Sequence, residues 1–158
     1  MLATLLAAGT GFVRPAIVWH ALAPEIILVI TIAVALLIDV SSPEGSRWTV
    51  SSVAGIGLLA AMIPLLTLAA DNSSRVMFGG AYVVDDFALV LKGLFLVAGY
   101  LTILVSTTTI AEGDYYEGEY YLLLVSSLLG MTFMASARDL ISIFVAVGRF
   151  STPAYLLA

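Results

Sequence analysis

Long apolar stretches separated by short polar segments constrain this chain more than any other feature. A helix that spans a bilayer needs about 20 mostly apolar residues, and a charge in mid-membrane is costly. Five stretches of this kind occupy residues 22–40, 50–70, 86–109, 120–136 and 139–158. Runs such as YLLLVSSLLGMTFMA lack the alternation of a membrane strand and satisfy their backbone groups only as helices. The sequence therefore predicts an all-α membrane protein with about five transmembrane helices in a polytopic region over 22–158.

The amino-acid composition indicates a lipid environment and argues against nucleic-acid binding and against metal, haem or iron-sulfur sites on this chain. Hydrophobic residues make up 61% of the chain and charged residues 11%, which is too apolar for a soluble domain, so the lipid bilayer is the expected partner. The net charge of -5 provides no basic surface for nucleic acid. Because the chain has no Cys and one His, thiolate or His-rich metal, haem and iron-sulfur sites are not expected on it.

The segment before the first span, residues 1–21, is predicted to be an interfacial or flexible lead-in. Its first 13 residues are too short to span, and it lacks the basic start of a signal peptide. Four arginines flank the predicted spans. If each span crosses the membrane, three of them lie on the side of the N-terminus and one on the other side: Arg14, Arg75 and Arg138, and then Arg47. By the positive-inside rule this count places the N-terminus inside.

Small residues recur at helical spacing in two spans. Gly57 with Ala61, and Ser126 with Gly130, are each four residues apart. Small side chains let helix backbones approach closely in a membrane bundle. We expect these positions to mark helix packing and no cofactor.

Lys92 is the candidate proton-path residue. It lies six residues beyond Asp86, about 9 Å into the predicted helix at 1.5 Å per residue. Asp85 precedes it by seven residues, nearly two helical turns, so the two side chains could face one direction. One interpretation is a lysine that snorkels to the surface and pairs with an aspartate. The other is a proton-relay site, because burial makes an ammonium proton easier to release.

Three further ionisable residues fall in or near spans. Arg149 stands about ten residues into the last span, where it needs a carboxylate, a water cavity or a different course of the helix. Its own span offers only Asp139, about 15 Å away along the axis. His20 and Glu25, near the start of the first span, are five residues apart and so face different directions on a helix. They are interpreted as interfacial residues in contact with water.

Several of these segments resemble a known family. They are MFGGAYVVDDFALVLKGLF (77–95), EYYLLLVSSLLGMTFMASARDLISIFVAV (119–147) and STPAYLLA (151–158). All three closely resemble subunit N of the bacterial proton-translocating NADH-quinone oxidoreductase, respiratory complex I, and LAPEIILVITIAVALLIDV (22–40) resembles that subunit's opening helix. The resemblance implies the N-terminal part of an antiporter-like helix bundle. It also implies an N-terminus on the outer side, opposite to the arginine count.

The resemblance further implies a role and partners. The chain would be a multi-pass, membrane-arm subunit in the bacterial inner (plasma) membrane, taking part in proton translocation beside other complex I membrane subunits. NADH, FMN, iron-sulfur clusters and the quinone substrate would be held by other subunits, so this chain has no independent catalysis and binds no cofactor.

The chain departs from the family in two respects. The family's fifth helix usually reads VALELLS, whereas residues 145–151 here read VAVGRFS, so Gly148 occupies the place of a membrane-embedded glutamate and Arg149 replaces an apolar residue. Family members have about fourteen spanning helices, so five imply an N-terminal fragment without the later channel lysines. Two alternatives therefore stay open: a component of a cation/proton antiporter, and a structural or nonfunctional fragment.

Overall fold

A computed structural model describes residues 18–41, 47–71, 74–111 and 117–157. Five long helices dominate it: α2 (Ala23–Ser41), α3 (Arg47–Ala70), α4 (Asp86–Ala111), α5 (Glu117–Ser136) and α6 (Leu140–Leu157). Each is long and apolar enough to cross a membrane. The all-α membrane class is confirmed. Of the predicted lead-in, residues 1–17 lie outside the described part of the chain, and Trp19–Leu22 forms the 3-10 turn η1.

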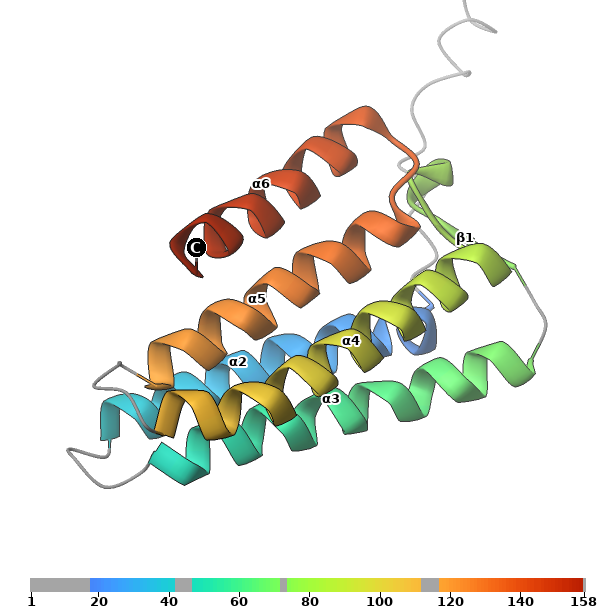
Figure 1. Cartoon of the computed structure of the whole chain (residues 1–158). Helices are drawn as coiled ribbons and strands as arrows, with labels where there is room; N and C mark the ends of the chain where they lie inside the picture. The colour runs from blue at the N-terminus through green and yellow to red at the C-terminus, as the bar shows by residue number, and fades with distance from the viewer. Residues whose placement is uncertain (1–17, 42–46, 72–73, 112–116, 158) are drawn as a thin grey trace, which may run out of the picture.

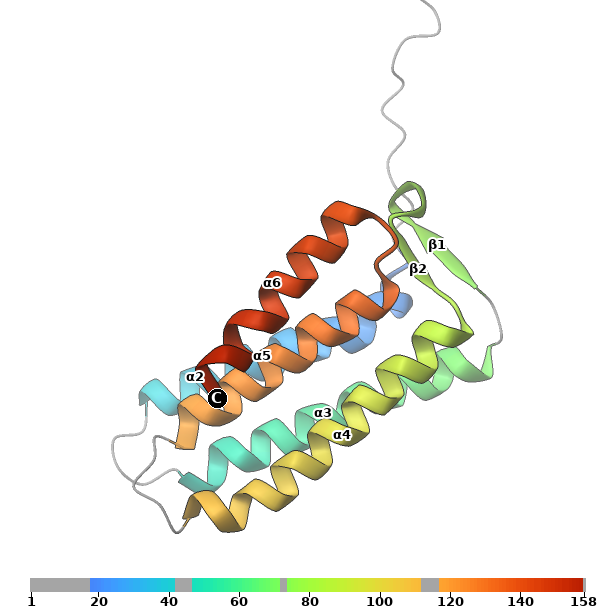
Figure 2. The ribbon, with the colours of Figure 1, turned by 45° about the horizontal axis from the view of Figure 1, so that its top comes forward.

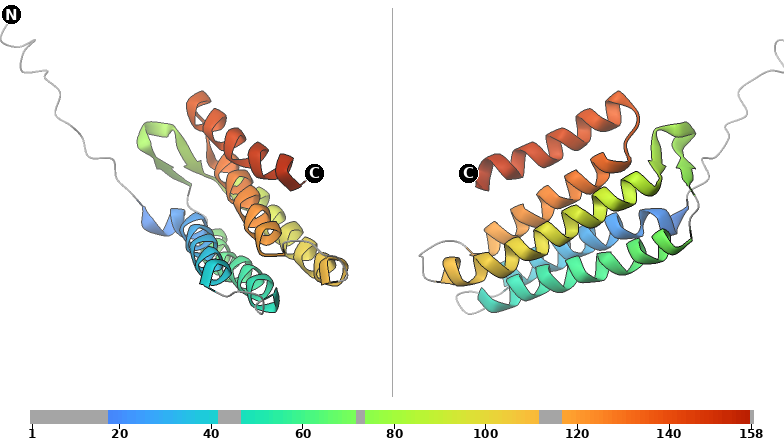
Figure 3. Two further views of the ribbon diagram at one scale, coloured as in Figure 1. Left: turned by 90° about the vertical axis from the view of Figure 1, so that its left-hand side faces the viewer. Right: turned by 45° about the vertical axis from the view of Figure 1, so that its right-hand side comes forward.

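The helices run up and down, each antiparallel to the next in the sequence (Figure 1). Helices α2 to α5 form a bundle, and α6 lies along the outside of α5 (Figure 3). Of the 18-residue apolar stretch in each helix, only 11% is buried in α6, whereas 44% is buried in α3. Helix α6 is therefore the peripheral helix. The starts of α2, α4 and α6 share one end of the bundle with the ends of α3 and α5.

Glycines bring helices into close contact, as the small-residue spacing predicts. A Cβ on Gly57 of α3 would lie 2.2 Å from the side chain of Thr31 on α2. A Cβ on Gly130 of α5 would lie 2.7 Å from the backbone nitrogen of Phe150 on α6. Both distances are far below van der Waals contact, so these two helix pairs pack at separations that only glycine allows.

A short β-hairpin at one end of the bundle is not predicted from the sequence. Strands β1 (Arg75–Met77) and β2 (Tyr82–Val84) pair antiparallel around η2 (Phe78–Gly80), in which Gly79 and Gly80 adopt positive φ angles of 67° and 99°. Figure 2 shows the hairpin beside the link between α5 and α6. A bridge joins Tyr82 to Ala137, and the Arg138 amide donates to the Ala81 carbonyl at 2.9 Å. Three-residue strands carry too little alternation to be recognised in a sequence.

Candidate functional site: a buried Glu–Lys–Tyr cluster

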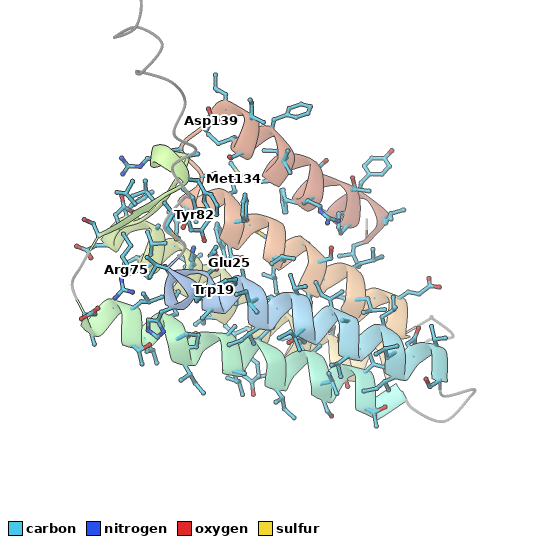
Figure 4. The ribbon with its side chains drawn as sticks, turned by 180° about the vertical axis from the view of Figure 1, so that it is seen from behind. Trp19, Glu25, Arg75, Tyr82, Met134 and Asp139 are labelled. Carbon is cyan, nitrogen blue, oxygen red and sulfur yellow. The ribbon has the colours of Figure 1, made fainter. Side chains whose placement is uncertain are left out.

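Lys92 of α4 lies inside the bundle and not at its surface. Its side chain is 1% exposed, and its Nζ lies 2.6 Å from Oε1 of Glu25 in the first turn of α2, which is itself 7% exposed. The Tyr82 hydroxyl, from β2, accepts a hydrogen bond from Lys92 Nζ at 2.9 Å and donates one to Glu25 Oε1 at 2.9 Å. Glu25 of α2 thus meets Tyr82 and Lys92, from two consecutive elements much later in the chain, in one buried polar cluster, with Glu25 and Tyr82 close together near the hairpin (Figure 4).

Asp85 anchors the helix that carries Lys92. Its Oδ1 accepts the Ala88 amide hydrogen at 2.9 Å, an N-cap that fixes where α4 begins. Its Oδ2 accepts from Arg138 at 2.7 Å, which ties the start of α4 to the α5–α6 link. The Ala88 amide, and then the Arg138 guanidinium, hold the pKa of Asp85 below its usual value. The cap sets the register in which Lys92, two turns later, faces inward.

Two expectations from the sequence are wrong. Lys92 neither pairs with Asp85 nor snorkels, since Asp85 is paired with Arg138 and Lys92 is buried against Glu25. Glu25 is not an exposed interfacial residue but is almost completely buried. His20 is exposed as expected, with its Nε2 3.1 Å from the Thr67 hydroxyl oxygen. Glu25 could have been recognised as a site residue from the sequence, because it is an acidic residue inside the first apolar stretch. Tyr82 could be recognised only once the fold of the hairpin was known.

The ring of Tyr82 completes the surroundings of the ammonium group. Lys92 Nζ lies 5.1 Å from the ring centroid, within cation–π range, and the ring packs against Phe133 with centroids 5.4 Å apart. Burial, and then the negative charge of Glu25, raise the pKa of Tyr82. The hydroxyl therefore stays protonated and serves as a hydrogen-bonded bridge between the amine and the carboxylate.

Glu25 also lines a pocket beside the cluster. Glu25 Oε2 is buried and has no hydrogen-bond partner among the described residues. Glu25 lines a cavity of about 410 Å³ between α2, α5 and α6, to which Ser126 and Arg149 also contribute. Within the described ranges Arg149 forms no ion pair, with Asp139 or any other carboxylate. Arg149 is exposed and lines the same pocket as Glu25, without forming an ion pair with it.

Gly148 has open space around it. A Cβ built there meets nothing within 4 Å, and the residue is exposed on α6. The place that the resemblance gives to a glutamate therefore faces away from the neighbouring helices, and a larger side chain fits there. In the described part of the chain, no group of three or more His, Cys, Asp or Glu side chains could hold a metal ion.

Comparisons with known proteins show that the chain is similar to one kind of subunit. The chain is 34% identical over 142 residues to NADH-quinone oxidoreductase subunit N of Anoxybacillus flavithermus, covering 88% of this chain. It is 34% identical over 137 residues to NAD(P)H-quinone oxidoreductase subunit 2 of Thermosynechococcus vestitus, covering 85% of this chain. The chain is homologous to subunit N of NADH-quinone oxidoreductase. No protein-family model matches it.

A solved structure of respiratory complex I contains a chain with a similar fold. A chain of respiratory complex I from Thermus thermophilus superposes with a TM-score of 0.70 at 27% identity, covering 85% of this chain and 28% of that one. The present chain spans 28% of the Anoxybacillus subunit N and 26% of the Thermosynechococcus subunit 2. This subunit N homologue is thus a multi-pass membrane protein with about a quarter of the length of its relatives.

Proposed function

We propose that this chain acts within the membrane arm of an NADH-quinone oxidoreductase, in a bacterial plasma membrane, and that its buried cluster carries protons. The observation that supports the proposal is the ion pair between Lys92 of α4 and Glu25 of α2. Its two atoms lie 2.6 Å apart, and both side chains are buried between the apolar helices. Homology to subunit N of an NADH-quinone oxidoreductase supports this setting. We propose that NADH oxidation and quinone reduction occur on other subunits of the complex. FMN, iron-sulfur clusters and quinone are expected there and not on this chain.

The geometry supplies a short route for one proton. Lys92 Nζ donates to the Tyr82 hydroxyl, and that hydroxyl donates to Glu25 Oε1. When Lys92 gives its proton to the Tyr82 oxygen and Tyr82 passes its own proton to Glu25, the charged pair becomes a neutral amine and a neutral carboxylic acid. The hydroxyl is restored at the end of the step. Burial disfavours the charged forms of both groups, which favours this exchange to the neutral pair.

The test is proton pumping by the assembled complex in membrane vesicles. Lys92→Met removes the proton donor, and we expect the protons moved per NADH oxidised to fall severalfold while the complex still assembles. Val90→Met is the matched control, because Val90 lies on the same helix and is 70% exposed, away from the buried cluster. Normal pumping by an assembled Lys92→Met complex would show that the pair is only structural.

A second variant separates the relay from folding. Losing Lys92 alone leaves the Glu25 carboxylate buried without its cation, which costs about 3–5 kcal/mol for a buried pair. Lys92→Met combined with Glu25→Leu removes both charges and is expected to recover stability. If the double variant assembles fully and still fails to pump, the proton role holds; if it pumps normally, the role is excluded.

A further inference from the structure

The hydroxyl of Ser136, the last residue of α5, is buried and has no complete hydrogen bond. Ser136 is 1% exposed, and its Oγ has no hydrogen-bond partner among the described residues. Buried polar groups in folded proteins are nearly always hydrogen-bonded, so an unpaired buried hydroxyl calls for an explanation. The proton route proposed between Lys92 and Glu25 does not use this hydroxyl.

Two contacts place Ser136 beside Tyr82. The Tyr82 ring packs against Phe133 with ring centroids 5.4 Å apart, and the Tyr82 backbone forms a β-bridge with Ala137. Ser136 lies three residues beyond Phe133, on the same face of α5, and directly before Ala137. Burial, and then the charge of Glu25, raise the pKa of Tyr82, whereas the nearby Ser136 hydroxyl acts on it in the opposite direction. The two hydroxyls are therefore neighbours, although they do not form a complete hydrogen bond.

The Tyr82 oxygen gains a need for another donor during proton transfer. In the ion-paired state it donates its proton to Glu25 Oε1 and accepts one hydrogen bond, from Lys92 Nζ. As its proton leaves for Glu25, negative charge develops on the oxygen until the proton of Lys92 arrives. Hydrogen bonds to a charged oxygen are roughly twice as strong as those to a neutral one. A hydroxyl that is only a neighbour of neutral Tyr82 therefore becomes a strong partner of its anionic form.

We infer that Ser136 is a further proton-path residue, whose hydroxyl donates a hydrogen bond to the Tyr82 oxygen while that oxygen carries negative charge. The inference rests on the proposed function, because it concerns the same proton exchange. The Tyr82 O–H bond breaks and its proton forms the O–H bond of the Glu25 acid; Lys92 then gives a proton to the Tyr82 oxygen and becomes a neutral amine. Ser136 keeps its own proton throughout, and its hydrogen bond lowers the energy of the charged oxygen between the two transfers.

Two variants of similar shape isolate the Ser136 hydroxyl. Ser136→Thr keeps the hydroxyl and Ser136→Val replaces it by a methyl group, so a role in packing alone affects both alike. In vesicles that contain the assembled complex, we expect Ser136→Val to pump protons about tenfold more slowly than Ser136→Thr. Ser136→Ala, which adds no atoms to the buried site, should slow pumping by a similar factor relative to wild type. Ser127, another buried serine about 13.5 Å away along α5, is the control: Ser127→Val and Ser127→Thr should pump equally.

A deuterium effect shows whether the slowed step is the proton transfer itself. In D₂O, pumping by Ser136→Val is expected to fall by a larger factor than pumping by Ser136→Thr, because proton transfer then limits the rate; equal factors would overturn the inference. Equal pumping by the two variants, in membranes where Lys92→Met pumps severalfold less, would also overturn it and leave the proposed function intact. Normal pumping by an assembled Lys92→Met complex would overturn both.

Discussion

At the residue scale, Asp85 shows how one side chain positions the site without touching it. One carboxylate oxygen caps α4 through the Ala88 amide, and the other holds Arg138 on the α5–α6 link. The sequence identified Lys92 correctly as an unusual residue but assigned it the wrong partner. Spacing along one helix makes Asp85 look suitable, whereas the actual partner, Glu25, is brought close by packing between segments far apart in the chain.

The charge of Asp85 predicts a pH dependence of stability. Its folded pKa is lowered, so its contribution is complete above the unfolded value of about 3.9 and is lost as the pH falls through the folded value. Asp85→Asn keeps a capping side chain but removes the charge. In detergent at pH 7, thermal unfolding is expected to show a loss of about 0.5–1 kcal/mol relative to wild type.

The same comparison at acid pH completes the test. Below the folded pKa both proteins carry an uncharged side chain at this position, so their difference should vanish. Asp86→Asn, at the exposed neighbouring position, is the control for the loss of one negative charge. A difference between wild type and Asp85→Asn that persists unchanged at acid pH would contradict the assignment.

At the element scale, the contact between α5 and α6 depends on one glycine. The peripheral helix α6 packs mainly on α5, and Gly130 is the point at which the backbone of α6 comes closest. Small-residue spacing identified Gly130 from the sequence, but it did not identify the helix that approaches it. Only the fold shows that the backbone of Phe150 fills the space a side chain would need.

Gly130→Ala is therefore expected to loosen α6. Its Cβ would lie 2.7 Å from the Phe150 backbone nitrogen, an atom that can move only if the helix moves. Overpacking of this kind costs about 1–3 kcal/mol, measured as a lower unfolding midpoint and faster proteolysis near α6. Gly148→Ala is the matched control, since its Cβ meets nothing and alanine favours a helix by up to about 1 kcal/mol. Equal midpoints for the two variants would refute the close contact.

At the scale of the whole molecule, α6 leaves a broad apolar face without a protein neighbour among the described residues. The most exposed of its large apolar side chains are Leu140, Ile141, Phe144, Tyr155 and Leu156. The homologous subunits are about four times as long as the matched region, since that region covers 26–28% of them. Under the proposed function, this face lies against further protein of the membrane arm.

That placement predicts association with other complex I subunits. After mild detergent extraction, an affinity-tagged chain is expected to copurify with membrane subunits of an NADH-quinone oxidoreductase, identified by mass spectrometry. An unrelated tagged membrane protein from the same cells controls for carry-over. Purification of the chain by itself, from cells that contain the assembled complex, would contradict the proposed role and favour an antiporter component or a separate structural protein.

The sequence by itself determined that the chain forms five membrane helices, because hydropathy summed over about 20 residues is a local property that no tertiary contact has to supply. It also marked Lys92 and Arg149, since a charge within an apolar run is visible in one dimension, whereas Gly148 was marked only by the resemblance to a family. The tertiary structure decided which of these groups meet. Lys92 contacts Glu25, and Tyr82 contacts both, only because the helices pack against one another and against the short β1–β2 hairpin. Such packing depends on segments that lie far apart in the chain, so the sequence of one segment does not reveal it.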